Sequence, residues 1–468
     1  MQVVLVTLVL LTIIPETTAM TTTAAAAAAK MSSSVRVAII GGGISGCASA
    51  RRLAQLAPSA QITLYEIGRG LGGRASTRKT RSMPHIYINH GVPYADIRSS
   101  VGRSLISSLG PSCAAAFPGV RGSLDSRTGE FSQGDREKEN SGVDFDANAG
   151  NKPDYVTGAN GEMSQIASSM VSGIPSVETK YKTMIRGLSR EPGGEWKLLD
   201  KSNKVIGSAD WLVVAGSGVA HPRWSKTFGG EPPLIAAEKA HPDPKLREAL
   251  DAIATQQVSP VLAVFFSCSG SAARQWLSLD FDVADVKESS ILSRVMIQGG
   301  KKDENCCASD DVGDDWCSVV LHSTEDFALQ NSGVYGSSSS AARVGDAASD
   351  AFRENSLIKE MMVATKEIPG MPTIDDIESD ESNKTESSSR YDYGPVIHRW
   401  GNAFPKGDPL SEDLSFLRSS RIAFCGDYVA SSERIRFGSF ESALLSGTFA
   451  GEKIARYCQE QQSSSSTQ

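Results

Sequence analysis

The sequence predicts an α/β fold in which a Rossmann-type domain is built from discontinuous segments and an α+β domain is inserted between them. Three observations predict this fold. A β-branched run, a glycine-rich turn and a small-residue helix pattern stand at residues 35–57. A second strand–Gly-Asp–helix unit stands at residues 421–455, and strand-like apolar runs fill the interval between the two units. Because βα units build parallel sheets, we expect the two distant units to share one layered domain.

Size and composition describe a globular protein of two or three domains. The chain has 468 residues, of which 40% are apolar and 22% are charged, as in ordinary soluble domains. Its 47 basic and 54 acidic residues give a net charge of −7, which argues against nucleic-acid binding through phosphate contacts. The eight cysteines form no Cys-x-x-Cys pair, and no metal site is predicted.

Residues 1–34 read as a targeting or disordered leader. Residues 3–14, VVLVTLVLLTII, are nearly all apolar but too few to span a bilayer as a helix. They resemble the apolar core of a signal peptide, with the small residues Thr17 and Ala19 where a peptidase would cut. Secretory or organelle entry follows if this segment is functional. A cytoplasmic protein follows if translation starts at Met20 or Met31. No stable membrane span is predicted in the mature chain.

The first glycine-rich turn predicts a dinucleotide-binding site. The run Val35–Ile40 suits a buried parallel strand, and a G-x-G-x-x-G motif, GGGISG at 41–46, follows it at once. Gly41 permits the tight turn, Gly43 lets a pyrophosphate approach the backbone, and Gly46 lets the helix pack on the sheet. The alternative is a glycine turn in a Rossmann unit that binds no ligand.

The residues after this turn complete the pattern. The helix that follows offers free N–H groups at its N-terminus, beside Ile44 and Ser45, and these groups attract phosphate. A second strand, Gln61–Tyr65, leads to Glu66, which lies 20 residues past Gly46. A carboxylate at that distance can accept hydrogen bonds from ribose hydroxyls.

A second glycine motif distinguishes FAD from NAD as the predicted cofactor. Gly72-Gly73-Arg74 lies just past Glu66, and it resembles the G-G-R segment of FAD-dependent oxidoreductases of the amine oxidase type. In those proteins the arginine approaches the FAD phosphates, to which a guanidinium offers a charged fork. The resemblance implies cofactor contacts from Gly73 and Arg74. The alternative is an exposed basic loop.

The C-terminal unit resembles the second FAD-binding element of the same class. A buried strand is predicted from residue 421, ending at Gly426 and Asp427, before a loop and a helix capped by Ser439. The resemblance implies that Asp427 meets the ribityl–pyrophosphate region. It also implies that the helix N-terminus near Phe440 faces the flavin N1–C2=O edge, where a positive dipole end stabilises anionic reduced flavin. The alternative is a plain βα unit that closes a sheet.

A third element is predicted between these two. Residues 180–185, KYKTMI, form a possible strand beside the adenine, with Ile185 as a cofactor contact. Apolar runs at 196–200 and 209–215 follow and resemble the hairpin and returning strand of such flavoproteins.

The order of these elements resembles the FAD-dependent amine oxidase superfamily and, within it, the renalase-like group. The resemblance covers most of residues 35–220 and 390–458. Five stretches carry the closer likeness: NHGVPY at 89–94, GANGEM at 158–163, VVLHST at 319–324, IPGMP at 368–372 and HRWGNA at 398–403. Asn89 stands where relatives often carry an acid. The Ser-Gly-Gly-Cys-Tyr segment that carries covalent flavin in monoamine oxidases is absent, which implies non-covalent FAD.

The resemblance also sets expected domain boundaries. The FAD-binding domain is expected at 35–100, 150–220 and 390–460, and the substrate domain at 221–389 with a contribution from 101–149. Residues 461–468 are expected to be a disordered tail. Polar stretches at 121–152, 300–315 and 374–390 read as solvated insertions. The runs at 258–266, 291–297 and 317–322 predict a mixed or antiparallel sheet.

The function implied by the resemblance is that of an FAD-dependent oxidoreductase. The flavin would accept a hydride from a small substrate, such as an NAD(P)H-related dihydronicotinamide isomer, and O2 would take the electrons. His322, Trp400 and Tyr94 are the candidate catalytic residues on the flavin-facing wall, and each is otherwise a core residue. Amine oxidation is the first alternative. The second is a non-catalytic binding protein on a flavoprotein scaffold.

Overall fold

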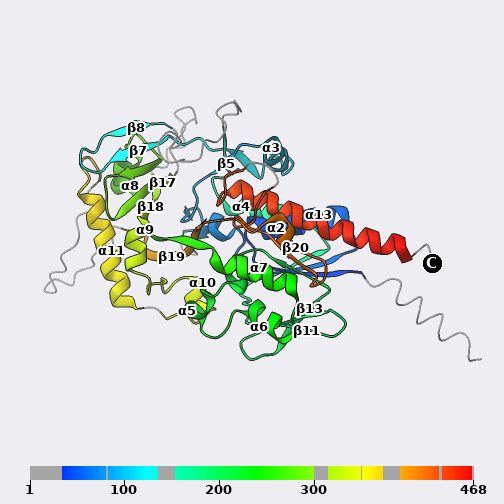
Figure 1. Cartoon of the computed structure of the whole chain (residues 1–468). Helices are drawn as coiled ribbons and strands as arrows, with labels where there is room; N and C mark the ends of the chain where they lie inside the picture. The colour runs from blue at the N-terminus through cyan, green and yellow to red at the C-terminus, as the bar shows by residue number, and fades with distance from the viewer. Residues whose placement is uncertain are drawn as a thin grey trace, which may run out of the picture.

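The computed structural model describes residues 34–80, 83–134, 153–299, 315–348, 350–372, 391–431 and 435–465. The predicted leader up to residue 33, the polar stretches 300–314 and 374–390, and much of the polar stretch 121–152 lie outside these residues. Two large sheets organise the described chain (Figure 1): one has six strands and the other has seven. Within these residues, no helix is both long and apolar enough to cross a membrane.

The six-stranded sheet is the predicted Rossmann-type layer. Its order is β10-β2-β1-β14-β21-β20, so the strand that opens the chain lies at the centre. The first five strands are parallel and β20 is antiparallel. The bounds are β1 Arg36–Ile40, β2 Gln61–Tyr65, β10 Val177–Lys180, β14 Trp211–Val214, β20 Phe416–Leu417 and β21 Ile422–Phe424. The first and last predicted units are therefore joined through β14 in one sheet.

Helices and a small sheet cover the two faces of this layer. One face packs on α2, α4 and α13, and the other on a three-stranded sheet with α6 and α7. The bounds are α2 Ile44–Leu56, α4 Ser164–Val171, α13 Phe440–Ser465, β11 Gly187–Arg190, β12 Trp196–Leu199, β13 Val205–Ala209, α5 Trp224–Phe228, α6 Pro233–Ala240 and α7 Pro244–Thr255. Both faces are buried, as a parallel sheet of continuous apolar strands requires.

The seven-stranded sheet is the predicted mixed sheet of the inserted domain. Its order is β19-β15-β18-β17-β16-β7-β8, and all neighbours are antiparallel except β16 and β7. The bounds are β7 Arg121–Asp125, β8 Phe131–Gln133, β15 Gln257–Ser269, β16 Val283–Lys287, β17 Leu292–Gly299, β18 Trp316–Ser323 and β19 Tyr393–Lys406. Helices α8 Gly270–Leu277, α9 Glu325–Gln330 and α11 Ala351–Lys366 pack against it. Figure 1 shows this sheet beside α11, away from α13.

Short elements connect the two sheets. A β3–β4 hairpin lies against β17 and β18, and a small sheet of β5, β9 and β6 lies near α13. The bounds are β3 Thr77–Lys79, β4 Tyr87–Asn89, β5 Ala95–Ile97, α3 Ser100–Ser107, β6 Ala114–Ala116, β9 Asp154–Gly158, α10 Ser340–Arg343 and α12 Glu412–Ser415.

Four expectations are corrected. Residues 121–133 are not part of a solvated insertion, because β7 pairs with β16 and buries Leu124. β19 falls within the segment assigned to the FAD-binding domain but is an edge strand of the seven-stranded sheet. The strand expected at 180–185 ends at Lys180, since β10 runs from Val177 and the chain then turns. Finally, α13 continues through Ser465, so the expected disordered tail is helical up to that residue.

Close packing between α2 and α13 depends on glycine. A Cβ atom at Gly447 would lie 2.1 Å from the carbonyl oxygen of Ser45, and one at Gly451 would lie 2.6 Å from that of Ser49. The two helices therefore touch backbone to backbone, and α13 holds the N-terminus of α2 in place.

We expect Gly447→Ala to destabilise the protein, although alanine favours helix by about 1 kcal/mol over glycine. The methyl group must push the helices apart, which costs about 1–3 kcal/mol. The free energy of unfolding in urea measures this. Gly333→Ala is the control, because no atom lies within 4 Å of a Cβ there, and it should change stability by less than about 0.5 kcal/mol. A more stable Gly447→Ala variant would contradict the packing.

Candidate functional site

A cleft of about 470 Å³ lies at the carboxyl ends of β1, β14 and β21. Segments far apart in the sequence line it. The N-terminal part contributes the first glycine turn, Glu66 and the second glycine turn, and the C-terminal part contributes Gly426, Asp427 and Phe440. The seven-stranded sheet contributes the remaining wall through β15, β18 and β19. Ligands of open α/β sheets bind at this edge, outside the carboxyl ends of the strands.

The first glycine turn has the backbone that a diphosphate requires. Gly41 has φ +110°, in the region that favours glycine. A Cβ atom at Gly46 would lie 2.0 Å from the carbonyl oxygen of Gly41, whereas one at Gly43 would meet nothing within 4 Å. Helix α2 has no side-chain cap and no acid in its first turn. Its first N–H groups, at Ile44 and Ser45, therefore face the cleft with the positive end of the helix dipole.

Glu66 is held by the backbone around it. Its side chain is buried, and its carboxylate accepts N–H hydrogen bonds from Gly42, at 2.8 Å, and from Gly68. Burial raises the pKa of Glu66, and these two hydrogen bonds partly oppose that rise. A carboxylate has about four acceptor positions, so Glu66 can accept further hydrogen bonds from a ligand.

The two glycine turns pack directly on each other. Gly72 donates its N–H to the Gly42 carbonyl at 2.8 Å, and Gly43 and Gly72 form an isolated β-bridge. A Cβ atom at Gly73 would lie 3.3 Å from the Cα of Gly43. The two motifs, which the sequence separates by about one helix and one strand, therefore form one surface.

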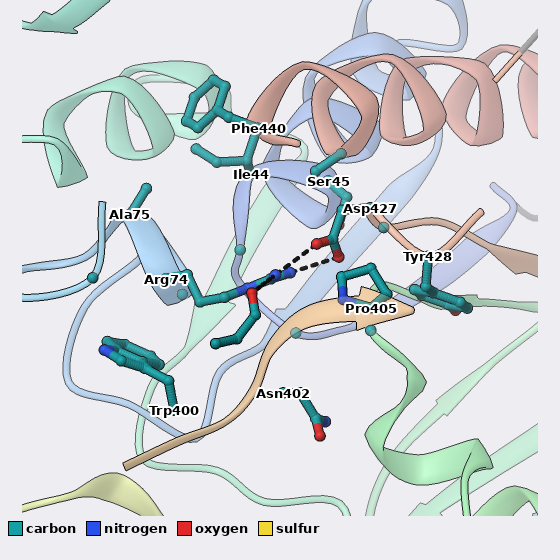
Figure 2. Close-up of a pocket in the computed structure, with 18 of the residues that line it drawn as sticks. Ile44, Ser45, Arg74, Ala75, Trp400, Asn402, Pro405, Asp427, Tyr428 and Phe440 are labelled. Carbon is teal, nitrogen blue, oxygen red and sulfur yellow. Dashed lines mark hydrogen bonds and ion pairs between the residues drawn. The ribbon is translucent and has the colours of Figure 1, made fainter. Parts of the chain in front are cut away.

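Arg74 joins this surface to the C-terminal unit (Figure 2). Its Nη1 and Nη2 atoms each lie 2.6 Å from a different oxygen of Asp427, and Nη1 also donates to the Ala403 carbonyl at 2.7 Å. Burial lowers the pKa of Arg74, but the Asp427 carboxylate raises it by more, so the net shift is upward. The guanidinium fork predicted for the diphosphate thus points at Asp427 and β19.

The N-terminus of α13 reaches the cleft at Phe440. Ser442 donates its N–H to Ser439 Oγ at 3.0 Å, and Ser439 donates its own N–H to Ser442 Oγ at 3.2 Å. The predicted cap is therefore present and reciprocal. Glu441 turns away from the cleft and accepts the N–H groups of Arg98 and Ser99.

His322 of β18 and Trp400 of β19 line the wall that faces this region. Both bond to the carbonyl oxygen of His90: His322 Nε2 at 3.1 Å and Trp400 Nε1 at 3.1 Å. Because a carbonyl can only accept, Nε2 of His322 carries the proton and Nδ1 is left as an acceptor. Burial, with Arg294, lowers the pKa of His322 to about 4.

Two histidines behind this wall were not predicted. The His398 ring lies 4.2 Å and the His90 ring 5.0 Å from the Trp400 ring, between centroids. Burial, with Arg78, lowers the pKa of His398 to about 3, and burial lowers that of His90 as well. All three imidazoles are neutral near pH 7. No sequence spacing signals this group, because it is assembled from β18, β19 and the residue that follows β4.

Three predicted site residues do not line the cleft. Tyr94 does not line the cleft; its ring packs on Phe117 at 4.9 Å and on Tyr155 at 5.3 Å. Ile185 is buried in the core beneath β14. Gly46 does not line the cleft either but packs against the backbone of Gly41. The other predicted residues all line it: Gly41, Gly43, Ile44, Ser45, Glu66, Gly73, Arg74, His322, Trp400, Gly426, Asp427 and Phe440.

Sequence reasoning missed several lining residues. They come from the turn after β14, from β15 and from β19: Gly216, Ser217, Gly218, Val258, Val261, Asn402, Ala403, Phe404 and Pro405. The run Ala215-Gly216-Ser217-Gly218 was a visible signal, since a glycine turn after a parallel strand faces the ligand edge. Among the described residues, the lining includes no cysteine, and Glu66 and Asp427 are its only carboxylates. In the described part of the chain, no cluster of side chains could hold a metal ion.

Comparisons with known proteins agree with this architecture. The model of the NAD(P)-binding Rossmann-like domain family matches residues 39–98, which hold both glycine turns and Glu66. No curated protein is significantly similar to the chain in sequence.

Three solved structures share the fold over about nine tenths of the chain. Cyclohexylamine oxidase from Brevibacterium oxydans IH-35A matches 91% of this chain and 100% of its own, with 12% identity and a TM-score of 0.53. A protein of Exiguobacterium sp. 255-15, provisionally named a protoporphyrinogen oxidase, matches 91% and 99%, with 12% identity and a TM-score of 0.52. Wild-type putrescine oxidase bound to putrescine matches 90% and 99%, with 14% identity and a TM-score of 0.51. The predicted α/β fold is confirmed.

The buried neutral His322 generates a prediction about pH. Its pKa is 6.5 in the unfolded chain and about 4 when folded, so the unfolded state binds the proton more readily. The free energy of unfolding therefore keeps its full value above pH 6.5 as far as His322 is concerned. It falls by up to about 3 kcal/mol as the pH falls toward 4. We expect His322→Asn to flatten the fall of unfolding free energy over that range in urea titrations.

The matched control is His241→Asn, because His241 is exposed. It should keep the wild-type pH dependence. Equal slopes for wild type and His322→Asn between pH 6.5 and 4 would contradict a buried, neutral imidazole.

Proposed function

We propose that this protein is an FAD-dependent oxidoreductase that holds FAD non-covalently. One observation carries the proposal: a single cleft joins the first glycine turn and Glu66 to Gly426, Asp427 and the N-terminus of α13. These are the two ends of an elongated dinucleotide site, and the chain supplies them from residues almost 400 positions apart. A domain that binds only NAD would not need Gly426, Asp427 and the N-terminus of α13 in its cleft.

The residues present fit the cofactor. The open N–H groups of α2 and the bare backbone at Gly43 suit a diphosphate. Glu66 keeps acceptor positions for ribose hydroxyls, and the Arg74–Asp427 pair offers donors and acceptors between the two ends. The chain lacks the Ser-Gly-Gly-Cys-Tyr segment, and no cysteine lines the cleft in the described part of the chain. This supports non-covalent binding.

When bound, FAD supplies a two-electron acceptor for a hydride. The chain's own residues then have three tasks. The α13 N-terminus at Phe440 offers a positive dipole end. Trp400 and His322 form a wall that positions the substrate and excludes water. The neutral His322 is held in one orientation by the His90 carbonyl, so its position is set before a substrate arrives.

We further propose that the substrate is a small dihydronicotinamide-type hydride donor and that O2 takes the electrons, as in the renalase-like group. Among the described residues, the two carboxylates that line the cleft serve the cofactor in this proposal: Glu66 keeps its free acceptor positions for ribose hydroxyls, and Asp427 is paired with Arg74. The wall from the seven-stranded sheet is mostly apolar, through Val258, Val261 and Phe404. It also carries one indole, at Trp400, and two neutral polar side chains, His322 and Asn402. An uncharged planar ring suits this wall better than an ammonium group, which is costly to bury without a carboxylate partner.

Amine oxidation is the competing activity. Two proteins of the same fold are named as oxidases of cyclohexylamine and putrescine. A non-catalytic binding protein is the second competitor. Gly43 speaks against it, because a Cβ atom there would meet nothing within 4 Å and its φ is −73°, so neither packing nor backbone conformation requires glycine at that position.

The purified protein should be yellow, and denaturation should release intact FAD. Replacing Glu66 with glutamine removes the charged acceptor and should weaken FAD binding about 10- to 100-fold, from the loss of about 1.5–3 kcal/mol. The FAD dissociation constant measures this, with far-ultraviolet circular dichroism to confirm folding. Glu178→Gln, on the exposed edge of β10, is the control and should bind as wild type does. A colourless chain that cannot be reconstituted with FAD would end the proposal.

A substrate panel tests the finer claim. Flavin absorbance should bleach with α-, β- or ring-isomeric dihydronicotinamides under nitrogen, and admitted air should restore it with release of hydrogen peroxide. The rate of flavin bleaching should fall in Trp400→Ala, since the nicotinamide ring of the substrate then loses the surface on which it packs. Turnover with amines alone would replace the dihydronicotinamide proposal by amine oxidation while leaving the FAD assignment intact.

A further inference from the structure

Two cysteines face each other on neighbouring strands of the seven-stranded sheet, away from the cleft. Cys268 on β15 and Cys317 on β18 are direct partners in the antiparallel register, and their Sγ atoms lie 3.4 Å apart. Both side chains are fully buried. No other part of the proposed function uses them.

The backbone geometry permits a covalent bond between them. Directly opposite residues on antiparallel strands have Cα atoms about 4.5–5.5 Å apart. Disulfides span Cα separations of about 4.4–6.8 Å. Because the two sulfur atoms already face each other, they can approach to bonding distance through side-chain rotation, without a shift in register.

We propose that Cys268 and Cys317 form a cross-strand disulfide when the chain folds in the presence of a small-molecule disulfide. The thiolate of one cysteine attacks the small disulfide, forms a mixed disulfide and releases one small thiol. The second cysteine then attacks the protein-bound sulfur, forms the protein disulfide and releases the second small thiol. The two protein thiols are oxidised, losing two protons and two electrons, and the small disulfide is reduced to two thiols.

Burial determines when this exchange can occur. Thiolate is the reactive species. In the folded protein the hydrogen bond with Cys268 and burial raise the pKa of Cys317 far above its ordinary value. No surface of either thiol reaches solvent. Thiol–disulfide exchange therefore takes place while the chain is folding. Once the sheet has formed, burial protects the pair from further exchange in both the reduced and the oxidised state.

The bond is separate from the cofactor site. Cys268 and Cys317 belong to the core cluster that holds Phe266, Ala273 and Trp276, under α8. Side chains alternate along a strand, so His322, five residues past Cys317 on β18, points to the opposite face and lines the cleft. The disulfide would link β15 covalently to β18, and these two strands contribute Val261 and His322 to the cleft wall.

Peptide mapping of the full chain tests the proposal. The denatured, reduced protein is refolded with FAD, in one arm with a mixture of oxidised and reduced glutathione and in the other with excess reductant. Free thiols are then blocked and the chain is digested without reduction. We expect a linked Cys268–Cys317 peptide in the first arm, lighter by two hydrogen atoms than the sum of the free peptides, and none in the second.

Matched variants make the assignment specific. Cys268→Ser should abolish the link, whereas Cys458→Ser, at another buried cysteine on α13, should keep it. The oxidised wild type should also melt several degrees above the reduced form. Flavin content should be equal in the two forms, so a failure of FAD binding would contradict the proposed function and leave this inference standing.

Two results would overturn the inference. One is a folded chain from the glutathione arm in which both Cys268 and Cys317 are blocked as free thiols. The other is a link from either of them to a different cysteine, such as Cys306 or Cys307, which lie outside the described residues. If Cys268→Ser does not fold, the wild-type map alone decides. If refolding fails, the same map on the chain purified from an oxidising secretory compartment decides.

Discussion

The ion pair between Arg74 and Asp427 is the contact on which the cleft depends. It joins side chains 353 residues apart, and the same guanidinium bonds to the carbonyl of Ala403 on β19. Three regions thus meet at one group: the second glycine turn, the loop after β21 and the edge of the seven-stranded sheet. The Asp427 side chain is almost fully buried, with 7% of its surface exposed. A buried charge of this kind is costly unless it is paired, so the pair constrains all three regions at once.

Two different kinds of structure meet across this pair. On the Rossmann side the site is made of backbone: glycine turns in direct contact, open N–H groups and a carboxylate held by N–H donors. On the side of the seven-stranded sheet it is made of side chains, with Trp400 and His322 bonded to one carbonyl oxygen. The first surface suits the constant parts of a dinucleotide. The second presents one neutral imidazole, His322, beside an indole and apolar side chains, and the proposal of an uncharged ring as substrate rests on this surface.

The sequence predicted the Rossmann side well because its signals are local. Gly41, Gly43 and Gly46 define a turn whose geometry follows from a few consecutive residues, and Glu66 lies at a chain distance set by one helix and one strand. Ser439 likewise caps α13 as expected. The sheet wall was predicted only in part. His322 and Trp400 line the cleft, but Tyr94 packs on Tyr155. On the Rossmann side, Ile185, predicted as a cofactor contact beside the adenine, lies in the core.

The sequence by itself therefore determined the order of the βα units, the glycine turns and the presence of an inserted sheet, because each depends on short-range conformational preference and hydrophobic pattern. Only the tertiary structure decided that Arg74 pairs with Asp427, that His90 and His398 stand behind Trp400, and that Cys268 faces Cys317. These contacts depend on strand register and on the packing of segments hundreds of residues apart. No local pattern encodes such contacts, since the same side chain reaches a different partner when its strand shifts by one residue.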